Sequence, residues 1–227
     1  PASLHRFTQA SSSPFNDFAL ALRPCSASRT KSMPGPSGAA SACFRKRTWL
    51  PTMATGEHLG CFGLTEPGFG SNPGGMETIA RRSGDEWVLN GEKMWITGMH
   101  VASHIMLFCR TSGNDGDAKG ITCLIVPADD PAIEIDEYMW TFNMPTDHCR
   151  FYIKDLWVPE DAVFGPPEGG LALAQHFVHE NRIRQAASSV GAAMYCITEA
   201  INYANERRPF GKALSYNQAI QFPLVEL

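Results

Sequence analysis

The 227-residue sequence has no apolar run near the roughly 18 residues of a membrane-spanning helix, and it has no internal repeat. It also has no Cys-x-x-Cys pair, and a zinc site is disfavoured because no two cysteines have ligand spacing. An odd, scattered set of cysteines predicts free thiols in a reducing compartment. We therefore expect an intracellular protein, with mitochondrion, peroxisome and cytoplasm left open. The seven cysteines are Cys25, Cys43, Cys61, Cys109, Cys123, Cys149 and Cys196.

Acidic residues are almost missing from the first fifty positions, where seven Lys or Arg accompany only Asp17. Residues 51–227 carry twelve bases and twenty-two acids, so this larger part is acidic. An acidic surface argues against a nucleic-acid interface, and an anionic ligand would need individually placed Arg or Lys side chains. At this length the chain can hold one large domain or two small ones, each with a real core.

Residues 1–47 differ in composition from the rest, being rich in Ser, Ala, Pro and Arg and lacking sustained periodicity. Three interpretations compete: a disordered tail, a transit-peptide-like segment, and divergent sequence outside the native fold. We favour the divergent segment, because the chain begins at Pro1 rather than Met and runs straight into the pattern of a folded domain.

Residues 48–165 have the pattern of a β-domain. Asn90-Gly91, between Glu86–Leu89 and Glu92–Trp95, predicts a tight hairpin turn because both residues tolerate positive φ. The polar stretch 112–117 is interpreted as a turn, since a calcium loop would need a closing Glu that is missing. Several short strands at these intervals predict a barrel or sandwich. The further predicted strands are residues 105–109, 121–126, 151–153 and 156–158.

Residues 166–227 are predicted to be helical. Apolar residues recur three and four apart from Leu171 to Ala204, which predicts one long amphipathic helix that Pro209 ends. Ser215 and Gln218 resemble a capping box that opens a second helix. We therefore expect two antiparallel helices with an uncovered apolar face, in a chain that is cut short. The fold class predicted is α+β: an irregular N-terminal tail, a β-barrel or sandwich middle domain, and an incomplete antiparallel helical bundle.

The run Lys93-Met94-Trp95-Ile96-Thr97 indicates a ligand-binding strand. Strand alternation predicts Trp95 and Thr97 on one face, with Met94 and Ile96 on the other. An indole beside a hydroxyl suits a flat heteroaromatic ring with a hydrogen-bonding edge. A Trp in a barrel wall beside a solvated Thr is the alternative.

The run Cys61-Phe62-Gly63-Leu64-Thr65-Glu66-Pro67-Gly68-Phe69-Gly70-Ser71 forms a glycine-rich loop in which backbone N–H groups can approach a ligand closely. It is not a dinucleotide fingerprint, because Pro73 stands where the third glycine belongs and no βαβ unit surrounds it. Taken alone, it could equally be a surface turn.

Together the two runs closely resemble the flavin-contacting signatures of the acyl-CoA dehydrogenase family, and the resemblance extends over roughly Thr48 to Leu227. The segment Arg207-Arg208-Pro209-Phe210-Gly211-Lys212 matches the family's Arg-x-x-Phe-Gly-Lys segment in the same order. The resemblance implies FAD as cofactor, acyl-CoA as substrate, and desaturation between the α and β carbons, as in fatty-acid β-oxidation. It also implies an intact protein that is a homo-oligomer and passes electrons to another flavoprotein or to oxygen.

The resemblance also assigns roles to individual residues. Thr65 would bond the flavin pyrimidine edge, and Trp95 would pack on the isoalloxazine while Thr97 bonds near its N5 atom. Arg207 would reach the diphosphate of FAD in a neighbouring subunit, although a cation at a helix C-terminus is favourable in any case. The FAD contacts predicted are Phe62, Leu64, Thr65, Gly70, Ser71, Trp95, Ile96, Thr97, Arg207, Phe210 and Gln218, and the substrate contacts are Ser71 and Arg182.

No catalytic base is predicted in this chain. The family reaction needs a carboxylate base, and the helical position that holds it in a few members is Asn181 here, which has no basic site. Glu180 is rotated by about 100° around the helix and is expected to face elsewhere. Two alternatives stay open: an acyl-CoA oxidase that uses oxygen, and an inactive flavin- or acyl-CoA-binding remnant.

Overall fold

The computed structural model describes residue 47 and residues 49–141 and 147–227, so the predictions for residues 1–46 lie outside the described part. The chain divides into two compact units, with the boundary after Val178. Each unit is described by itself below. Within the described residues, no helix is long and apolar enough to cross a membrane.

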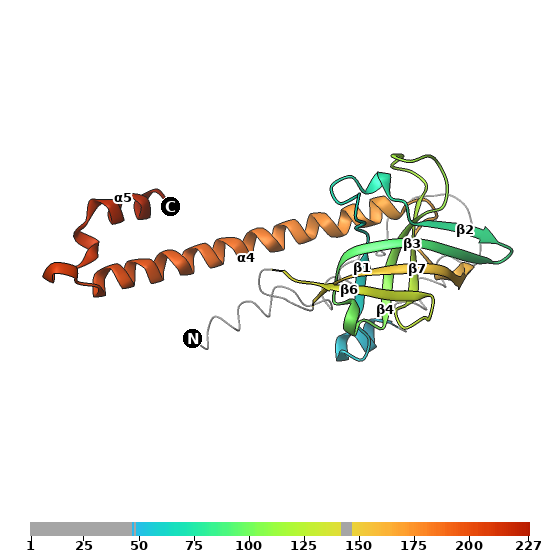
Figure 1. The fold of residues 1–227 in the computed structure, drawn as a ribbon, viewed down its shortest axis with the longest axis horizontal. Helices are drawn as coiled ribbons and strands as arrows, with labels where there is room; N and C mark the ends of the chain where they lie inside the picture. The colour runs from blue at the N-terminus through green and yellow to red at the C-terminus, as the bar shows by residue number, and fades with distance from the viewer. Residues whose placement is uncertain (1–46, 48, 142–146) are drawn as a thin grey trace. The chain divides into compact units, whose positions relative to one another are not determined.

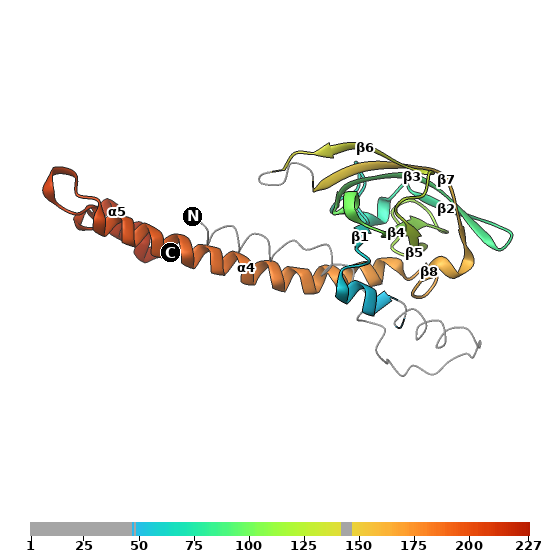
Figure 2. The same ribbon diagram turned by 90° about the horizontal axis from the view of Figure 1, so that it is seen from below.

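The first unit is built on one curled mixed sheet (Figures 1 and 2). Its strands run in the order β6-β7-β3-β2-β4-β5-β8, and β1 adds to β4 in parallel. All other pairings are antiparallel except one short parallel contact between β2 and β4. The strands are β1 Gly60–Gly63, β2 Ile79–Ser83, β3 Glu86–Thr97, β4 His104–Arg110, β5 Ile121–Pro127, β6 Ile133–Met139, β7 His148–Pro159 and β8 Val163–Phe164. The short 3-10 helices are η2 Pro73–Gly75, η3 Met99–Val101 and η4 Glu160–Ala162.

The predicted hairpin at Asn90-Gly91 is wrong, because β3 continues straight through both residues. The Asn90 side chain instead makes two hydrogen bonds with Asp155 of β7, where β7 bulges and Asp155 has φ 52°. The chain turns earlier, at Gly84, where φ is 64°. Gly91 serves close packing, since a Cβ there would lie 2.5 Å from the Thr78 hydroxyl oxygen. Likewise, the two strands predicted at 151–153 and 156–158 are one strand, β7.

Two apolar clusters stabilise the sheet. Strand β4 is buried on both faces, so that Ile105 and Leu107 belong to one cluster while Met106 and Phe108 belong to the other. The second cluster also includes Met53, from the helical residues 49–55, and Ala174 and Phe177, from the start of α4 (Gly170–Glu206). A strand that is buried on both faces has a continuous apolar sequence. The sequence therefore predicted β4 correctly.

The helical part consists of α4 (Gly170–Glu206), η5 (Pro209–Gly211), η6 (Leu214–Tyr216) and α5 (Gln218–Glu226). The long helix is confirmed and ends just before Pro209. The N-cap of α5 is Asn217 rather than the predicted Ser215, because the Asn217 side chain accepts a hydrogen bond from the Ala219 N–H at 3.0 Å. The expected exposed apolar side chains are present and include Ile183, Val190, Met194, Tyr203 and Phe222.

Candidate functional site

A buried ion pair joins the glycine-rich loop to β3. Lys93 Nζ lies 2.8 Å from Glu66 Oε1, and the two side chains are 0% and 3% exposed. The Glu66 carboxylate also accepts the backbone N–H groups of Glu77 at 2.6 Å and Thr78 at 3.0 Å. Burial alone would raise the pKa of Glu66, but the Lys93 ammonium and these hydrogen bonds hold it below its ordinary value. Glu66 is therefore charged at neutral pH.

This pair brings the two predicted flavin-contacting segments together. Lys93 Nζ also donates to the Leu64 carbonyl at 3.2 Å, and the Met94 N–H donates to the Thr65 carbonyl at 2.9 Å. Residues nearly thirty positions apart are thus held side by side through both side chain and backbone. Sequence reasoning did not single out Glu66 or Lys93. A lysine in the middle of an apolar strand was the feature that could have indicated a buried partner.

A bulge interrupts β3 next to this pair. Lys93 pairs with Phe151 and Ile96 with Cys149, so the two residues between them on β3 face a single residue of β7. Trp95 has φ 62° and is 46% exposed, whereas Ile96 is buried. The predicted simple alternation is therefore wrong between Lys93 and Ile96. Trp95 nevertheless points out of the core, as the flavin assignment requires.

Thr97 and Trp95 both adjoin the same histidine. Thr97 Oγ1 lies 2.8 Å from His148 Nδ1, at the end of β3 where these two residues are paired in the ladder. The Trp95 and His148 rings are 6.5 Å apart at an angle of 67°. Both predicted ligand-binding side chains thus lie beside His148, with the buried Ile96 between them along β3.

The residues of η2, just after the glycine-rich loop, are packed tightly. A Cβ on Gly75 would lie 2.3 Å from the Phe69 ring, so only glycine fits there without a shift. Arg110, which is 7% exposed, donates to the Gly74 carbonyl, and the Gly116 N–H reaches the same oxygen at 3.0 Å. Gly70 and Ser71, in contrast, are exposed.

Three of the predicted flavin contacts pack in or against the apolar clusters of this structure. The Phe62 ring stacks on Phe177 with centroids 4.3 Å apart and lies 4.8 Å from Phe108. Leu64 packs against the same cluster, and Ile96 belongs to the other one.

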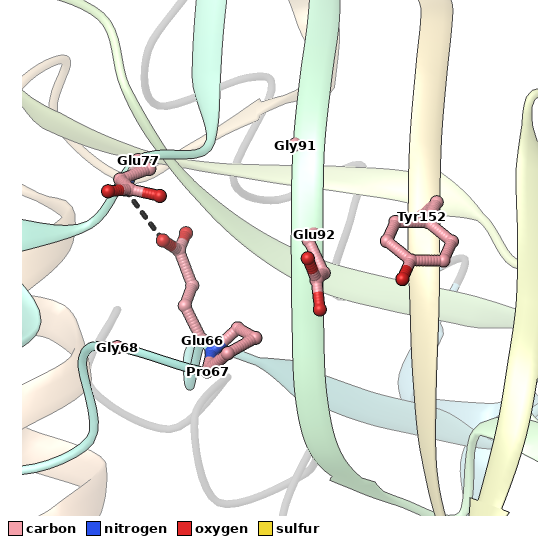
Figure 3. A pocket seen from close by; sticks show the side chains of 7 residues that line it. All are labelled: Glu66, Pro67, Gly68, Glu77, Gly91, Glu92 and Tyr152. Carbon is pink, nitrogen blue, oxygen red and sulfur yellow. Dashed lines mark hydrogen bonds between the residues drawn. The ribbon is translucent and has the colours of Figure 1, made fainter.

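A pocket of about 360 Å³ opens next to Glu66, as Figure 3 shows. Glu66 points toward Glu77 across it, while Glu92 and Tyr152 project from the neighbouring strands β3 and β7 (Figure 3). None of the predicted flavin contacts lines this pocket, so it does not support the flavin assignment. The lining residues are Glu66, Pro67, Gly68, Glu77, Gly91, Glu92 and Tyr152.

The other predicted contacts lie in the second unit, the helical unit His179–Leu227. Arg182, Arg207 and Gln218 are exposed, and Phe210 is fully exposed with φ 56°. Asn181 Oδ1 accepts two hydrogen bonds from the Arg184 guanidinium, at 2.9 and 2.6 Å. Asn181 thus stands where a catalytic base is expected, and its amide oxygen accepts hydrogen bonds from Arg184. An amide has no basic site, so Asn181 cannot take a proton from a substrate.

The remaining candidate chemistry is sparse. Within the described ranges, no three His, Cys, Asp or Glu side chains form a group that could hold a metal ion. The cysteines in the described part of the chain form no disulfide, and burial raises the pKa of the Cys109 and Cys149 thiols to about 12. These two thiols are therefore protonated and inert at neutral pH.

Comparison with known proteins gives consistent results. The family model "Acyl-CoA dehydrogenase, middle domain" matches residues 61–156, and "Acyl-CoA dehydrogenase, C-terminal domain" matches residues 168–227. The probable acyl-CoA dehydrogenase YngJ of Bacillus subtilis is 37% identical over 81% of this chain and 48% of its own length. The human mitochondrial short-chain specific acyl-CoA dehydrogenase is 34% identical over 81% of this chain and 44% of its own length.

A similar structure has been solved with a reduced flavin bound. The glutaryl-CoA dehydrogenase of Mycobacterium smegmatis in complex with FADH2 superposes with a TM-score of 0.73 at 35% identity, covering 81% of this chain and 46% of that one. The cofactor predicted from the sequence agrees with this relative. The chain spans about half the length of the curated relatives it matches.

Proposed function

Because this chain belongs to the acyl-CoA dehydrogenase family, we propose that the protein of which it forms part removes hydrogen from the α and β carbons of acyl-CoA thioesters, with FAD as cofactor. The observation that carries this proposal is the Glu66–Lys93 ion pair, which fixes the loop after β1 to β3 beside the exposed Trp95. When bound, FAD would supply the hydride acceptor.

The residues at the end of β3 fit a flavin. An indole that is nearly half exposed, next to a hydroxyl held by His148, offers an apolar face and a hydrogen-bonding edge to one flat ligand. We propose Trp95 for the ring face and Thr97 for its edge, with Thr65, Gly70 and Ser71 as further contacts. Phe62, Leu64 and Ile96 would act indirectly, by packing the core beneath the site.

The exposed side chains of the helical unit fit a role at a subunit interface. Phe210 leaves its whole ring in water, which is unfavourable unless a partner covers it. We propose that Arg207, Phe210 and Gln218 contact FAD held by a neighbouring copy in a homo-oligomer. A guanidinium suits the diphosphate of FAD because its planar fork can bind two oxygens at once. Arg182 is proposed for the acyl-CoA.

No described residue is proposed as the catalytic base, since Asn181 offers only an amide oxygen that Arg184 already engages. The electron acceptor is proposed to be a second flavoprotein or oxygen, inside the cell. Oxygen consumption by the whole protein, compared with reduction of an artificial electron acceptor, would separate an oxidase from a dehydrogenase.

The proposed flavin site is tested by titrating FAD with the purified chain and following flavin fluorescence. We expect weak binding, because this chain holds few of the contacts expected for the adenine end. Trp95→Ala should weaken it about two- to tenfold, the value of one aromatic stacking contact. Trp157→Ala is the matched control, since Trp157 is 53% exposed on β7, and it should change nothing. Equal effects of both substitutions would place the flavin elsewhere, and a stoichiometric yellow protein would refute weak binding.

A further inference from the structure

His148 is fixed beside Thr97 by backbone pairing on two sides. It is the first residue of β7, and it pairs with Thr97 of β3 on one side and with Met139 of β6 on the other. The Gly98 N–H also donates to the Asp147 carbonyl at 2.8 Å, which closes this end of the sheet. The 2.8 Å contact between Thr97 Oγ1 and His148 Nδ1 therefore joins two side chains on a rigid support.

The direction of this hydrogen bond decides what Thr97 can offer to a ligand. A hydroxyl has one proton to donate and can accept at its lone pairs, whereas the Nδ1 atom of a neutral imidazole either carries a proton or accepts one. If Nδ1 carries the proton, Thr97 accepts from His148 and keeps its own proton for the ligand. If Nε2 carries it, Thr97 donates to His148 and can only accept from the ligand.

A flavin needs both roles in turn. The N5 atom of the oxidised ring is a hydrogen-bond acceptor, and in the reduced ring it carries a proton and donates. We propose that His148 is a positioning residue for Thr97: it holds the hydroxyl at the flavin edge and takes whichever hydrogen-bond role the flavin state requires. This inference rests on the proposed function, and in particular on Thr97 lying at the edge of the ring.

The proposal predicts the position of one proton. With oxidised FAD bound, His148 carries its proton on Nδ1; with FAD reduced by dithionite, it carries the proton on Nε2, exchanged through water. Nitrogen-15 NMR of histidine-labelled chain at about pH 8, where histidines are ordinarily neutral, reads the two forms directly. The His148 signal is assigned by its loss in His148→Phe. Thr97→Val should abolish the difference between the two flavin states, and Thr97→Ser should retain it.

Affinity gives a second readout. His148→Phe should weaken FAD binding about two- to tenfold, the value of one hydrogen bond, while His148→Asn, whose amide can donate or accept, should stay within about twofold of the native chain. His100→Phe is the control, since His100 is exposed on η3, and its ring lies 6.3 Å from Tyr138. The same His148 tautomer in both flavin states, with FAD bound normally, would overturn this inference alone. No FAD binding by the native chain would overturn the proposed function together with it.

Discussion

Replacing Lys93 by Met should be among the most destabilising single changes in this chain. The substitution keeps the volume of an unbranched side chain but leaves the Glu66 carboxylate, which is 3% exposed, without its cation. Breaking a buried pair by removing one partner typically costs about 3–5 kcal/mol. Glu66 keeps the backbone N–H bonds from Glu77 and Thr78, so we expect the lower end of that range, about 3 kcal/mol. Urea unfolding measures the loss directly.

The pH dependence of that loss has a defined sign. In the native chain the folded pKa of Glu66 is lowered, so its contribution is complete above the ordinary glutamate pKa of about 4.3 and is lost as the pH falls through the folded value. Without Lys93, we expect burial to outweigh the two remaining backbone N–H bonds and to raise the pKa of Glu66 above its ordinary value. The Glu66 carboxyl of the variant then ionises at a lower pH in the unfolded chain than in the folded one, so the variant loses stability as the pH rises. The difference between native chain and variant should therefore be largest near neutral pH and shrink toward about pH 4.

Two controls make the test specific. The double variant Lys93→Met with Glu66→Gln removes both charges, and it should be less destabilised than the sum of the two single variants by about 1–3 kcal/mol. Lys154→Met breaks the exposed ion pair between Lys154 and Glu134, at 2.6 Å, and should leave the urea midpoint close to the native one. Strictly additive single variants, or a Lys93→Met chain as stable as Lys154→Met, would refute the argument that this pair holds the two segments together.

Three further predictions concern other parts of the chain. Burial, and after it the neighbouring His58, lowers the pKa of His104 to about 4. As the pH drops from about 6.5 to 4, His104 is protonated more readily in the unfolded chain than in the folded one, so the melting temperature should fall. His104→Gln should flatten this dependence. Gly91→Ala should cost about 1–3 kcal/mol in urea unfolding because its Cβ would overlap Thr78, whereas Gly68→Ala, where nothing lies within 4 Å, should be neutral. The chain supplied with FAD should not transfer electrons from acyl-CoA to a dye, and Asn181→Glu should restore at most a trace of this activity. If the native chain does turn over, and Glu180→Gln abolishes that turnover, then Glu180 is the base.

The sequence predicted the elements whose determinants are local. The strands β4 and β5 are continuous apolar runs, and α4 repeats its apolar residues at helical spacing and ends before Pro209, so each could be recognised within its own segment. The approximate site could also be predicted, because the two family-like runs are short and specific. The residues of that site that face a ligand remain predictions.

Two of the features that sequence reasoning missed depend on partners far away in the chain, whereas the third, the cap of α5, is local. Asn90-Gly91 has the composition of a turn, but Asp155 of β7 supplies hydrogen bonds that keep β3 extended through it. The N-cap of α5 is Asn217 rather than the predicted Ser215. Both residue types are good N-caps, so composition alone does not decide between them. Lys93 within a strand could have indicated a buried partner, but the sequence does not show that this partner is Glu66, which lies 27 positions earlier in the chain.

The bulge at Met94–Trp95 follows from combining that ion pair with an exposed indole. In a regular strand, Lys93 and Trp95 would project from the same face, so a lysine buried against Glu66 would carry Trp95 into the core with it. One extra residue in β3 separates the two: Lys93 and Ile96 both reach the interior, and Trp95 is left 46% exposed. The bulge places Trp95 at φ 62°, a conformation that costs a non-glycine residue about 1–3 kcal/mol and persists only where the surroundings enforce it. Here the buried pair enforces it on one side and the Thr97–His148 contact on the other, which is why the strain sits at the proposed flavin face rather than elsewhere in β3.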